Sequence, residues 1–213
     1  MNTNYVMVCD HPLLQDKMAR LRDAATPAQQ FRTLLHEITH CLGYEACREL
    51  PLKEQQVTTP METMGVGMLE VQPLLVPILR AGIAMTDAML QLLPTAQVGH
   101  VGLYRDHDLL EPVEYYVKLP KSVEGSHVFI LDPMLATGGS AAHAAQLVLR
   151  RGQPQQLTVI AIVAAPVGIQ RLQAVAPNTR VVTAAIDLGI DAQGYILPGL
   201  GDAGDRLYNT TLP

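Results

Sequence analysis

The most informative stretch of the sequence is Val128-Phe129-Ile130-Leu131-Asp132-Pro133-Met134-Leu135-Ala136-Thr137-Gly138-Gly139-Ser140. Its first four residues are apolar and predict a short buried strand. A single acid, Asp132, follows the strand, and a loop of small residues then runs to Ser140. The next residues, 141–151, are rich in alanine and predict a helix that ends at Gly152. A strand, a loop of small residues and a helix in this order are typical of α/β proteins.

The segments around this stretch alternate between predicted strands and predicted helices. Apolar runs predict strands at residues 74–79, 98–104, 157–165 and 181–186. Apolar residues at helical spacing predict helices at 83–93 and 168–176, each ended by a proline. Strands and helices that alternate at this spacing predict a mostly parallel sheet with helices on both faces.

The remaining segments extend this α/β unit at both ends. Residues 11–50 carry two apolar stripes that predict an N-terminal helical segment, and residues 51–70 indicate strand and turn. Alternation at 113–117 predicts an arm or hairpin. Residues 189–204 contain five glycines, which fits a turn-rich surface or a backbone that a ligand must approach closely.

Composition limits the class of protein. The chain has 213 residues, of which 48% are apolar, so residues 1–213 are expected to form a single domain. Its net charge of −5 and 4% aromatic content argue against a nucleic-acid partner. No apolar run approaches the roughly 18 residues of a membrane span, so no membrane association is expected. Three cysteines cannot all pair within the chain, which favours reduced thiols and a cytoplasmic location.

The loop after Asp132 has the features of an anion site. Free backbone amides at a helix N-terminus suit a phosphate, and Thr137 and Ser140 add hydroxyl donors. Ser140 is equally suited to capping the helix. The loop is not a P-loop, because no Gly-Lys-Ser/Thr follows at the required spacing. It is not a dinucleotide fingerprint either, because the pattern G-x-G-x-x-G is absent. Asp132 stands where ligands of open α/β sheets bind, and its carboxylate suits ribose hydroxyls or a metal.

The string from Asp132 to Ser140 resembles the phosphoribosyl diphosphate loop of type I phosphoribosyltransferases, in the form of the uracil phosphoribosyltransferases. Most type I members have two adjacent acids there, and one acid followed by Pro133 is what the uracil branch shows. Segments 76–82, 104–105 and 194–206 match the same branch, with weaker similarity at 11–13 and 44–46. The resemblance therefore covers nearly the whole chain and implies the type I fold with a C-terminal hood.

The resemblance implies an activity and its binding residues. Family members transfer a phosphoribosyl group from 5-phospho-α-D-ribose 1-diphosphate to uracil, which gives UMP and diphosphate, with Mg²⁺ as cofactor. Arg80 and Arg105 would bind the phosphoribosyl diphosphate. The ribose 5-phosphate would lie on the loop formed by Asp132, Pro133, Met134, Leu135, Ala136, Thr137, Gly138, Gly139 and Ser140, with Asp132 turned to the ribose hydroxyls.

By the same resemblance, uracil would contact Ile196, Gly201, Asp202 and Ala203, largely through main-chain groups. Asp202 would also face the phosphoribosyl diphosphate, through Mg²⁺ or water. Asp132, Asp202 and Arg105 are the implied catalytic residues, and residues 105–123 are a candidate lid. The sequence indicates no base for the uracil proton. The family also makes a homo-oligomer and activation by GTP plausible.

The two arginines differ in what the residues alone predict. Arg80 follows a buried strand beside Ala81-Gly82, which is an odd place for a residue that serves only solubility. Arg105 lies among Asp106, His107 and Asp108, so the residues alone indicate a solvated hairpin. Only the resemblance assigns Arg105 a ligand.

Two other functions compete with this assignment. His36, Glu37 and His40 form an H-E-x-x-H pattern, which on a helix is typical of zinc hydrolases. Against it, Ala46 stands where the extended motif requires a third histidine, and the neighbouring Ile38 belongs to an apolar stripe. The other alternative is a non-catalytic, nucleotide-sensing regulator with a phosphoribosyltransferase-like fold.

Overall fold

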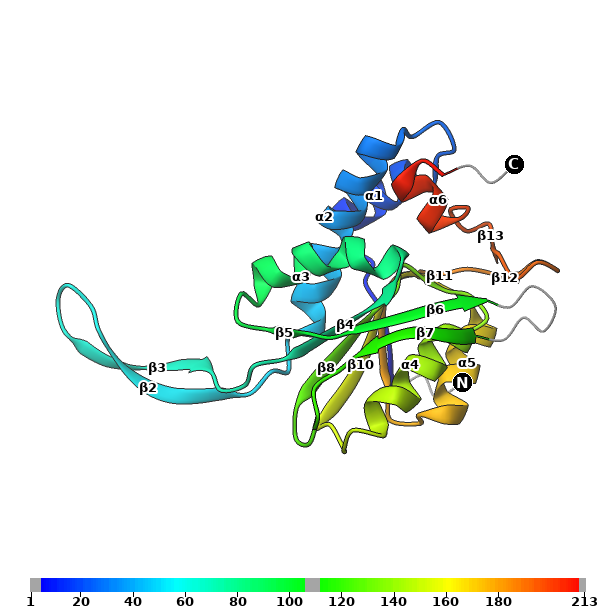
Figure 1. Ribbon diagram of the computed structural model, residues 1–213. Coiled ribbons are helices and arrows are strands. Elements are labelled where there is room, and N and C mark those ends of the chain that lie inside the picture. The colour runs from blue at the N-terminus through cyan, green and yellow to red at the C-terminus, as the bar shows by residue number, and fades with distance from the viewer. Residues whose placement is uncertain (1–4, 106–111, 211–213) are drawn as a thin grey trace.

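The fold is built on one large, mostly parallel sheet (Figure 1). The computed structural model describes residues 5–105 and 112–210. In these residues the sheet has nine strands, in the order β1-β11-β10-β8-β4-β6-β7, with β5 beside β4 and β9 beside β10. Only β7 runs antiparallel to its neighbour, β6. The strands are β1 (Val6–Val8), β4 (Leu74–Leu79), β5 (Gln97–Val98), β6 (His100–Arg105), β7 (Pro112–Lys118), β8 (His127–Leu131), β9 (Met134–Leu135), β10 (Gln156–Ala164) and β11 (Arg180–Ile186).

Helices cover both faces of the sheet and enclose two apolar cores (Figure 1). One core packs against α1 (Pro12–Arg22), α2 (Ala28–Ala46), the 3₁₀ turn η2 (Ala81–Met85), α3 (Thr86–Leu92) and α6 (Ala203–Tyr208). The other packs against α4 (Gly139–Leu149) and α5 (Pro166–Val175). The central strand β10 is buried along nearly its whole length, as expected for a parallel strand covered on both faces.

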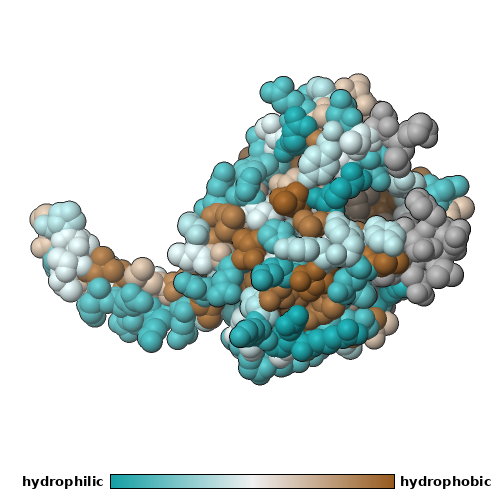
Figure 2. Space-filling view, viewed as in Figure 1, coloured by the Kyte–Doolittle hydropathy of each residue, from teal (hydrophilic) through white to brown (hydrophobic). Residues whose placement is uncertain are grey.

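A two-stranded arm projects from this body (Figure 1). It consists of β2 (Leu52–Thr58) and β3 (Thr63–Leu69), which pair antiparallel with each other only. Side chains that alternate along β3 share one face, so Met64 and Met68 lie on the same side as Val57, which pairs with Met64. These three side chains are exposed, and apolar residues gather along one side of the arm in Figure 2.

The predicted fold class is confirmed, and so are the N-terminal helices and the strands around residues 51–70. Residues 113–117 lie in β7, which forms the predicted hairpin with β6. Three short elements were not predicted: β1 at the edge of the sheet, β9 within the loop after Asp132, and the C-terminal helix α6. The small sheet of β12 (Gly189–Ile190) and β13 (Ile196–Leu197) lies in the glycine-rich segment.

No helix among the described residues is both long enough and apolar enough to cross a membrane. The three cysteines, Cys9, Cys41 and Cys47, are free thiols, as the sequence predicts.

Candidate active site

The loop after Asp132 lies at the carboxyl edge of the parallel sheet. The backbone amide of Asp132 donates to the Ile160 carbonyl oxygen, which continues the pairing of β8 with β10 for one more residue. The chain then turns into β9, which pairs with the end of β10, Leu135 being opposite Ala164. Helix α4 starts at Gly139, directly after the loop. The loop is thus held by the central strand on one side and by a helix on the other.

Two glycines allow this loop to pack against the next helix. Gly138 has φ +76°, a left-handed conformation that favours glycine, and it is the N-cap residue of α4. A Cβ on Gly138 would overlap the backbone of Gly168 in α5, and a Cβ on Gly168 would meet the carbonyl oxygens of Leu135 and Ala136. The backbone of the loop is therefore in close contact with α5, and its conformation depends on Gly168 as well as on its own glycines.

Asp132 is a half-buried acid at the end of β8. Burial raises the pKa of its carboxyl group to about 7, against an opposing hydrogen bond of 3.4 Å from the Met134 amide. A carboxyl group whose pKa lies near neutrality in a cleft marks a candidate functional site. A cation or hydroxyl groups brought by a ligand would favour its charged form.

Arg80 lies on a turn that is packed tightly against the end of β8. The turn follows β4, and the Leu79–Arg80 peptide bond is cis. A Cβ on Gly82 would overlap the carbonyl oxygen of Leu131, the residue before Asp132. Glycine at position 82 therefore brings the Arg80 turn beside the Asp132 loop. The two segments lie side by side because β4 and β8, the strands that precede them, are parallel neighbours in the sheet.

Arg80 also reaches the C-terminal segment. Its Nη2 atom lies 3.9 Å from the position that a Cβ on Gly204 would take, and an Asp202 carboxylate oxygen lies 3.2 Å from the same position. The Tyr208 hydroxyl donates a 3.2 Å hydrogen bond to the Arg80 carbonyl oxygen. Arg80 thus lies close to Asp202 and the start of α6, which follow it by more than a hundred residues in sequence.

A cavity of about 290 Å³ opens beside Arg80. Leu79, Ile83 and Tyr115 line it together with Arg80 and Tyr208. Tyr115 comes from β7 and Tyr208 from α6, so three separate parts of the chain contribute to the walls. Neither Tyr115 nor Tyr208 belongs to a motif that would have marked it in the sequence.

The glycine-rich segment 194–206, here called the hood, exposes Gly201 and Asp202 as well as the side chains of Tyr195 and Leu197. Ile196 and Ala203, two of the predicted uracil contacts, are buried in the core as whole residues. Gly201 is exposed and has φ +78°. Asp202 caps α6, because its Oδ1 atom accepts a 2.9 Å hydrogen bond from the Asp205 amide. That cap occupies one carboxylate oxygen of Asp202.

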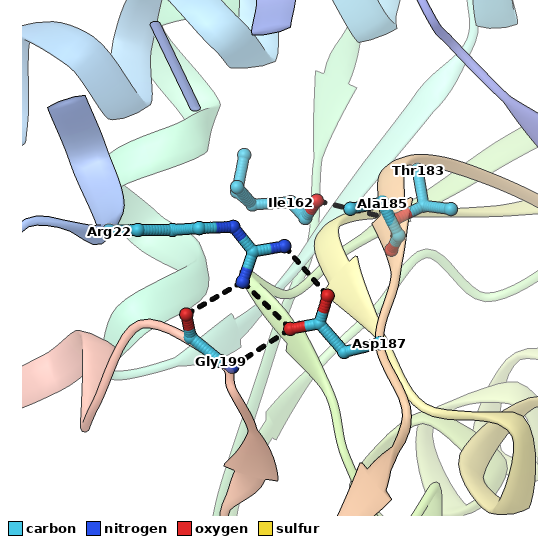
Figure 3. Close-up of polar contacts among 6 residues, drawn as sticks. All are labelled: Arg22, Ile162, Thr183, Ala185, Asp187 and Gly199. Atoms are coloured by element: carbon cyan, nitrogen blue, oxygen red, sulfur yellow. Dashed lines mark hydrogen bonds and ion pairs between the residues drawn. The ribbon is translucent and has the colours of Figure 1, made fainter. Parts of the chain in front are cut away.

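An ion pair between Arg22 and Asp187 holds the hood at Gly199 (Figure 3). Arg22, the last residue of α1, donates from both Nη atoms to the two carboxylate oxygens of Asp187, each at 2.7 Å. Arg22 Nη1 also donates to the Gly199 carbonyl oxygen at 2.7 Å, and the Gly199 amide donates to Asp187 at 2.8 Å. Both polar groups of the Gly199 backbone are thereby fixed. No motif in the sequence marks this pair, whose members are 165 residues apart.

Two further arginines attach the end of the hood to the N-terminal helices. Arg206 donates to the carbonyl oxygens of Leu21, Asp23 and Leu200 and lies over the Phe31 ring, 4.3 Å from its centroid. Arg32 donates to the Leu207 carbonyl oxygen at 2.7 Å. The hood is therefore positioned by contacts with α1 and α2, in addition to its own turns.

Arg105 is only partly described. Its backbone ends β6, paired with Pro112 of β7, whereas nothing is described of its side chain. Of the candidate lid, residues 106–111 lie outside the described residues, and 112–118 form the edge strand β7. The structure therefore brings together the Asp132 loop, Arg80 and the hood, and it leaves the contribution of Arg105 a prediction.

The zinc alternative finds no support in the structure. The described residues contain no group of three or more histidine, cysteine, aspartate or glutamate side chains that could hold a metal ion. Glu37 forms an ion pair with Lys17 of α1, and its neighbour Ile38 is fully buried in the core. The helix that carries His36 and His40 therefore faces the core and α1.

A site for Mg²⁺ does not require such a cluster of three side chains. This ion keeps several waters and commonly needs only one or two protein carboxylates beside substrate phosphates. Asp132 and Asp202 are two such carboxylates on the loop and the hood. These two carboxylates suit an Mg²⁺ ion whose other ligands are water and substrate phosphate oxygens.

Known proteins resemble this chain over almost its full length. A sequence model described as uracil phosphoribosyltransferase matches residues 8–210. A uracil phosphoribosyltransferase from Dictyoglomus thermophilum is 48% identical over 206 residues, which cover 96% of this chain and 99% of that protein. One from Streptococcus suis is 46% identical over 204 residues, covering 95% and 97%. The solved structure of the AQ2163 protein from Aquifex aeolicus is 35% identical with a TM-score of 0.92, covering 98% and 100%. The chain belongs to the uracil phosphoribosyltransferase family.

Proposed function

We propose that this chain transfers the phosphoribosyl group of 5-phospho-α-D-ribose 1-diphosphate to uracil, forming UMP and diphosphate in pyrimidine salvage. The observation that carries the proposal is the meeting of three segments at the carboxyl edge of the sheet. The loop from Asp132 to Ser140 supplies an anion site, Arg80 supplies a cation beside it, and the hood supplies the exposed Gly201 and Asp202. Family membership supports the same assignment.

In this proposal the ribose 5-phosphate binds at the start of α4. The amides of Gly138, Gly139 and Ser140 and the hydroxyl groups of Thr137 and Ser140 are its donors. Pro133, Met134, Leu135 and Ala136 contribute backbone, since β9 fixes this part of the loop against β10. Asp132, at the beginning of the loop, accepts hydrogen bonds from the ribose hydroxyls. An ionised carboxylate is the better acceptor, so ligand binding and deprotonation of Asp132 favour each other.

Arg80 and Arg105 bind the diphosphate in this proposal. Arginine offers planar, paired donors that match phosphate oxygens and stays charged at every physiological pH. Mg²⁺ would be held by Asp202, directly or through water, and Asp132 together with substrate oxygens, and it would neutralise charge on the diphosphate. Diphosphate is a good leaving group. The remaining task of the protein is to position the two substrates and to exclude water.

Uracil binds to the hood in this proposal, against the backbone of Ile196, Gly201, Asp202 and Ala203. Of these four residues Gly201 and Asp202 are exposed, so their main-chain groups are the accessible ones. A rigid peptide edge can match the fixed row of acceptors and the N–H donor of the base. The Arg22–Asp187 pair supplies the rigidity.

The test is a direct assay. Purified protein incubated with uracil, phosphoribosyl diphosphate and Mg²⁺ should form UMP and diphosphate in equal amounts, and chelation of Mg²⁺ should abolish the product. Arg80→Gln should reduce kcat/KM at least tenfold, whereas Arg151→Gln, an exposed arginine after α4, should leave it unchanged. Absence of UMP with and without GTP would overturn the proposal and would favour a nucleotide-sensing regulator.

We also propose that the enzyme is a homo-oligomer in which the arm contacts a second copy of the chain. Among the described strands, β2 and β3 pair only with each other. A two-stranded hairpin is marginally stable alone, and Val57, Met64 and Met68 on one of its faces are exposed. A protein surface that covers these side chains would remove them from water.

Three finer assignments belong to the same proposal. Residues 1–213 act as one phosphoribosyltransferase domain, the enzyme works in the cytoplasm, and GTP is a candidate activator. Initial rates measured with and without GTP at sub-saturating phosphoribosyl diphosphate test the last point. Limited proteolysis tests the first, because a single domain gives no two stable fragments.

A further inference from the structure

A second cavity lies at the amino edge of the sheet, opposite the candidate active site. Its volume is about 190 Å³, and the first residues of three neighbouring strands line it: His127 of β8, Gln156 of β10 and Arg180 of β11. Asp132 follows the other end of β8, five residues after His127. At about 3.3 Å per residue, the cavity and the active-site loop are separated by about 16 Å of strand. The cavity is therefore distinct from the site described above.

Arg180 is a buried cation in this cavity whose partners are weak. Its side chain is only 11% exposed, yet its partners in the described part of the chain are Glu49 at 3.4 Å and the Met7 sulfur at 3.6 Å. The Glu49 side chain is 73% exposed, and a thioether is a poor acceptor. Burial of a charge is costly unless strong hydrogen bonds compensate it. The guanidinium group is thus available to a stronger acceptor.

His127 provides a second unsatisfied group. The residue is 7% exposed, and its Nε2 atom is buried without a hydrogen-bond partner among the described residues. Burial lowers the pKa of His127, against a hydrogen bond with Gln155, so its ring is neutral at pH 7. His127 therefore adds no charge to the cavity, and Arg180 is the single cation among the described residues that line it.

Part of the cavity lining is apolar. Leu50 and Phe129 line it and are buried in the core. A volume of about 190 Å³ is below the range of about 300–1,000 Å³ that is usual for drug-sized ligands. The cavity therefore suits a molecule of about one six-membered ring with one polar head.

We propose that this cavity binds a small organic monoanion, whose carboxylate pairs with the Arg180 guanidinium while its apolar body packs against Leu50 and Phe129. A single carboxylate matches the single cation of the cavity. A dianion such as phosphate is disfavoured, because the Glu49 carboxylate stands at the same arginine and repels a second negative charge. On binding, the ligand displaces the exposed Glu49 side chain.

Benzoate and its neutral analogue benzamide test the proposal, because they differ in charge and scarcely in shape. Binding is measured by titration calorimetry on the full chain with saturating UMP, which keeps the active-site anion loop occupied. Benzoate should bind with one site per chain and at least tenfold more tightly than benzamide or inorganic phosphate. Arg180→Gln should weaken benzoate at least tenfold, and Arg151→Gln should leave its affinity unchanged.

Glu49→Gln provides a gain-of-binding control that does not depend on the fold tolerating a change at Arg180. It removes the competing carboxylate from an exposed position, so benzoate should bind several-fold more tightly than to the wild type. Equal affinities for benzoate and benzamide, tighter binding of phosphate, or an unchanged affinity in Glu49→Gln would each overturn the proposal. So would the absence of benzoate binding at tens of millimolar.

Discussion

Arg22 and Asp187 form a two-point ion pair, with both Nη–Oδ distances at 2.7 Å, that joins the end of α1 to the residue after β11. Both residues also bond the backbone of Gly199, at 2.7 and 2.8 Å (Figure 3). Gly199 itself cannot carry a side chain, because its φ is +61° and a Cβ would overlap the Ile196 carbonyl oxygen. The position of the hood over the sheet is thus set by an N-terminal helix.

Asp187→Ala should therefore destabilise the protein and loosen the hood. Loss of one member of a buried ion pair costs about 3–5 kcal/mol, because the other charge is left unpaired. In a chain of this size about 1 kcal/mol corresponds to about 2–4 °C, so the Tm should fall by about 6 °C or more. Among molecules that stay folded, the KM for uracil should rise more than that for phosphoribosyl diphosphate. An unchanged Tm would show that the pair does not hold the hood.

Asp132→Asn should reduce turnover at least tenfold and yet stabilise the fold at alkaline pH. Burial raises the pKa of Asp132 from 3.8 to about 7. The carboxyl group therefore contributes stability that is fully present below about pH 4 and is lost as pH rises through about 7. The variant should melt above the wild type at pH 8, and the difference should vanish towards pH 4. Thermal unfolding at the two pH values checks this, and equal melting at pH 8 would contradict the raised pKa.

Gly82→Ala should displace Arg80. A Cβ at position 82 would overlap the Leu131 carbonyl oxygen, which is backbone and cannot move aside cheaply. The turn must shift, so the KM for phosphoribosyl diphosphate should rise at least fivefold. The control is Gly189→Ala, where a Cβ meets no atom within 4 Å. Steady-state kinetics of both variants make the comparison, and equal effects would refute the role of this close contact.

Gly201→Val should raise the KM for uracil far more than that for phosphoribosyl diphosphate. Gly201 is exposed on the hood, and only Arg206 lies near its Cβ position, at 3.6 Å. Its φ of +78° adds backbone strain of about 1–2 kcal/mol to any side chain. Gly201→Ala carries this strain without the bulk and separates the two effects. If valine changed both KM values equally, the base would not bind at this glycine.

Introducing charge on the apolar face of the arm should break the oligomer. Met64→Glu combined with Met68→Glu places two carboxylates where a second copy is expected to cover exposed side chains. Sedimentation velocity should show a smaller species than the wild type. The matched control is Gln56→Glu, which lies on the opposite face of the same arm. An unaltered sedimentation coefficient in the double variant would exclude this face from the interface.

Local sequence determined much of the candidate site. The apolar run of β8, the acid at its end and the glycines before α4 specify a strand, a turn and a candidate anion site at a helix start within thirteen consecutive residues. Parallel strands place their carboxyl ends at one edge of the sheet, so Arg80 and this loop are both expected at that edge. The turns of the hood follow from its glycines. These features depend on neighbours in sequence or on the general geometry of α/β sheets.

Only the tertiary structure decided how these parts are held relative to one another. The Arg22–Asp187 pair joins residues 165 positions apart, and Gly168 fits against the loop from a different helix. The raised pKa of Asp132 is likewise a property of its surroundings, since burial removes the water that stabilises its charge. Long-range pairs and burial arise from the packing of distant segments. The residues next to a given position in the sequence do not indicate which distant residue it will contact or how deeply it will be buried.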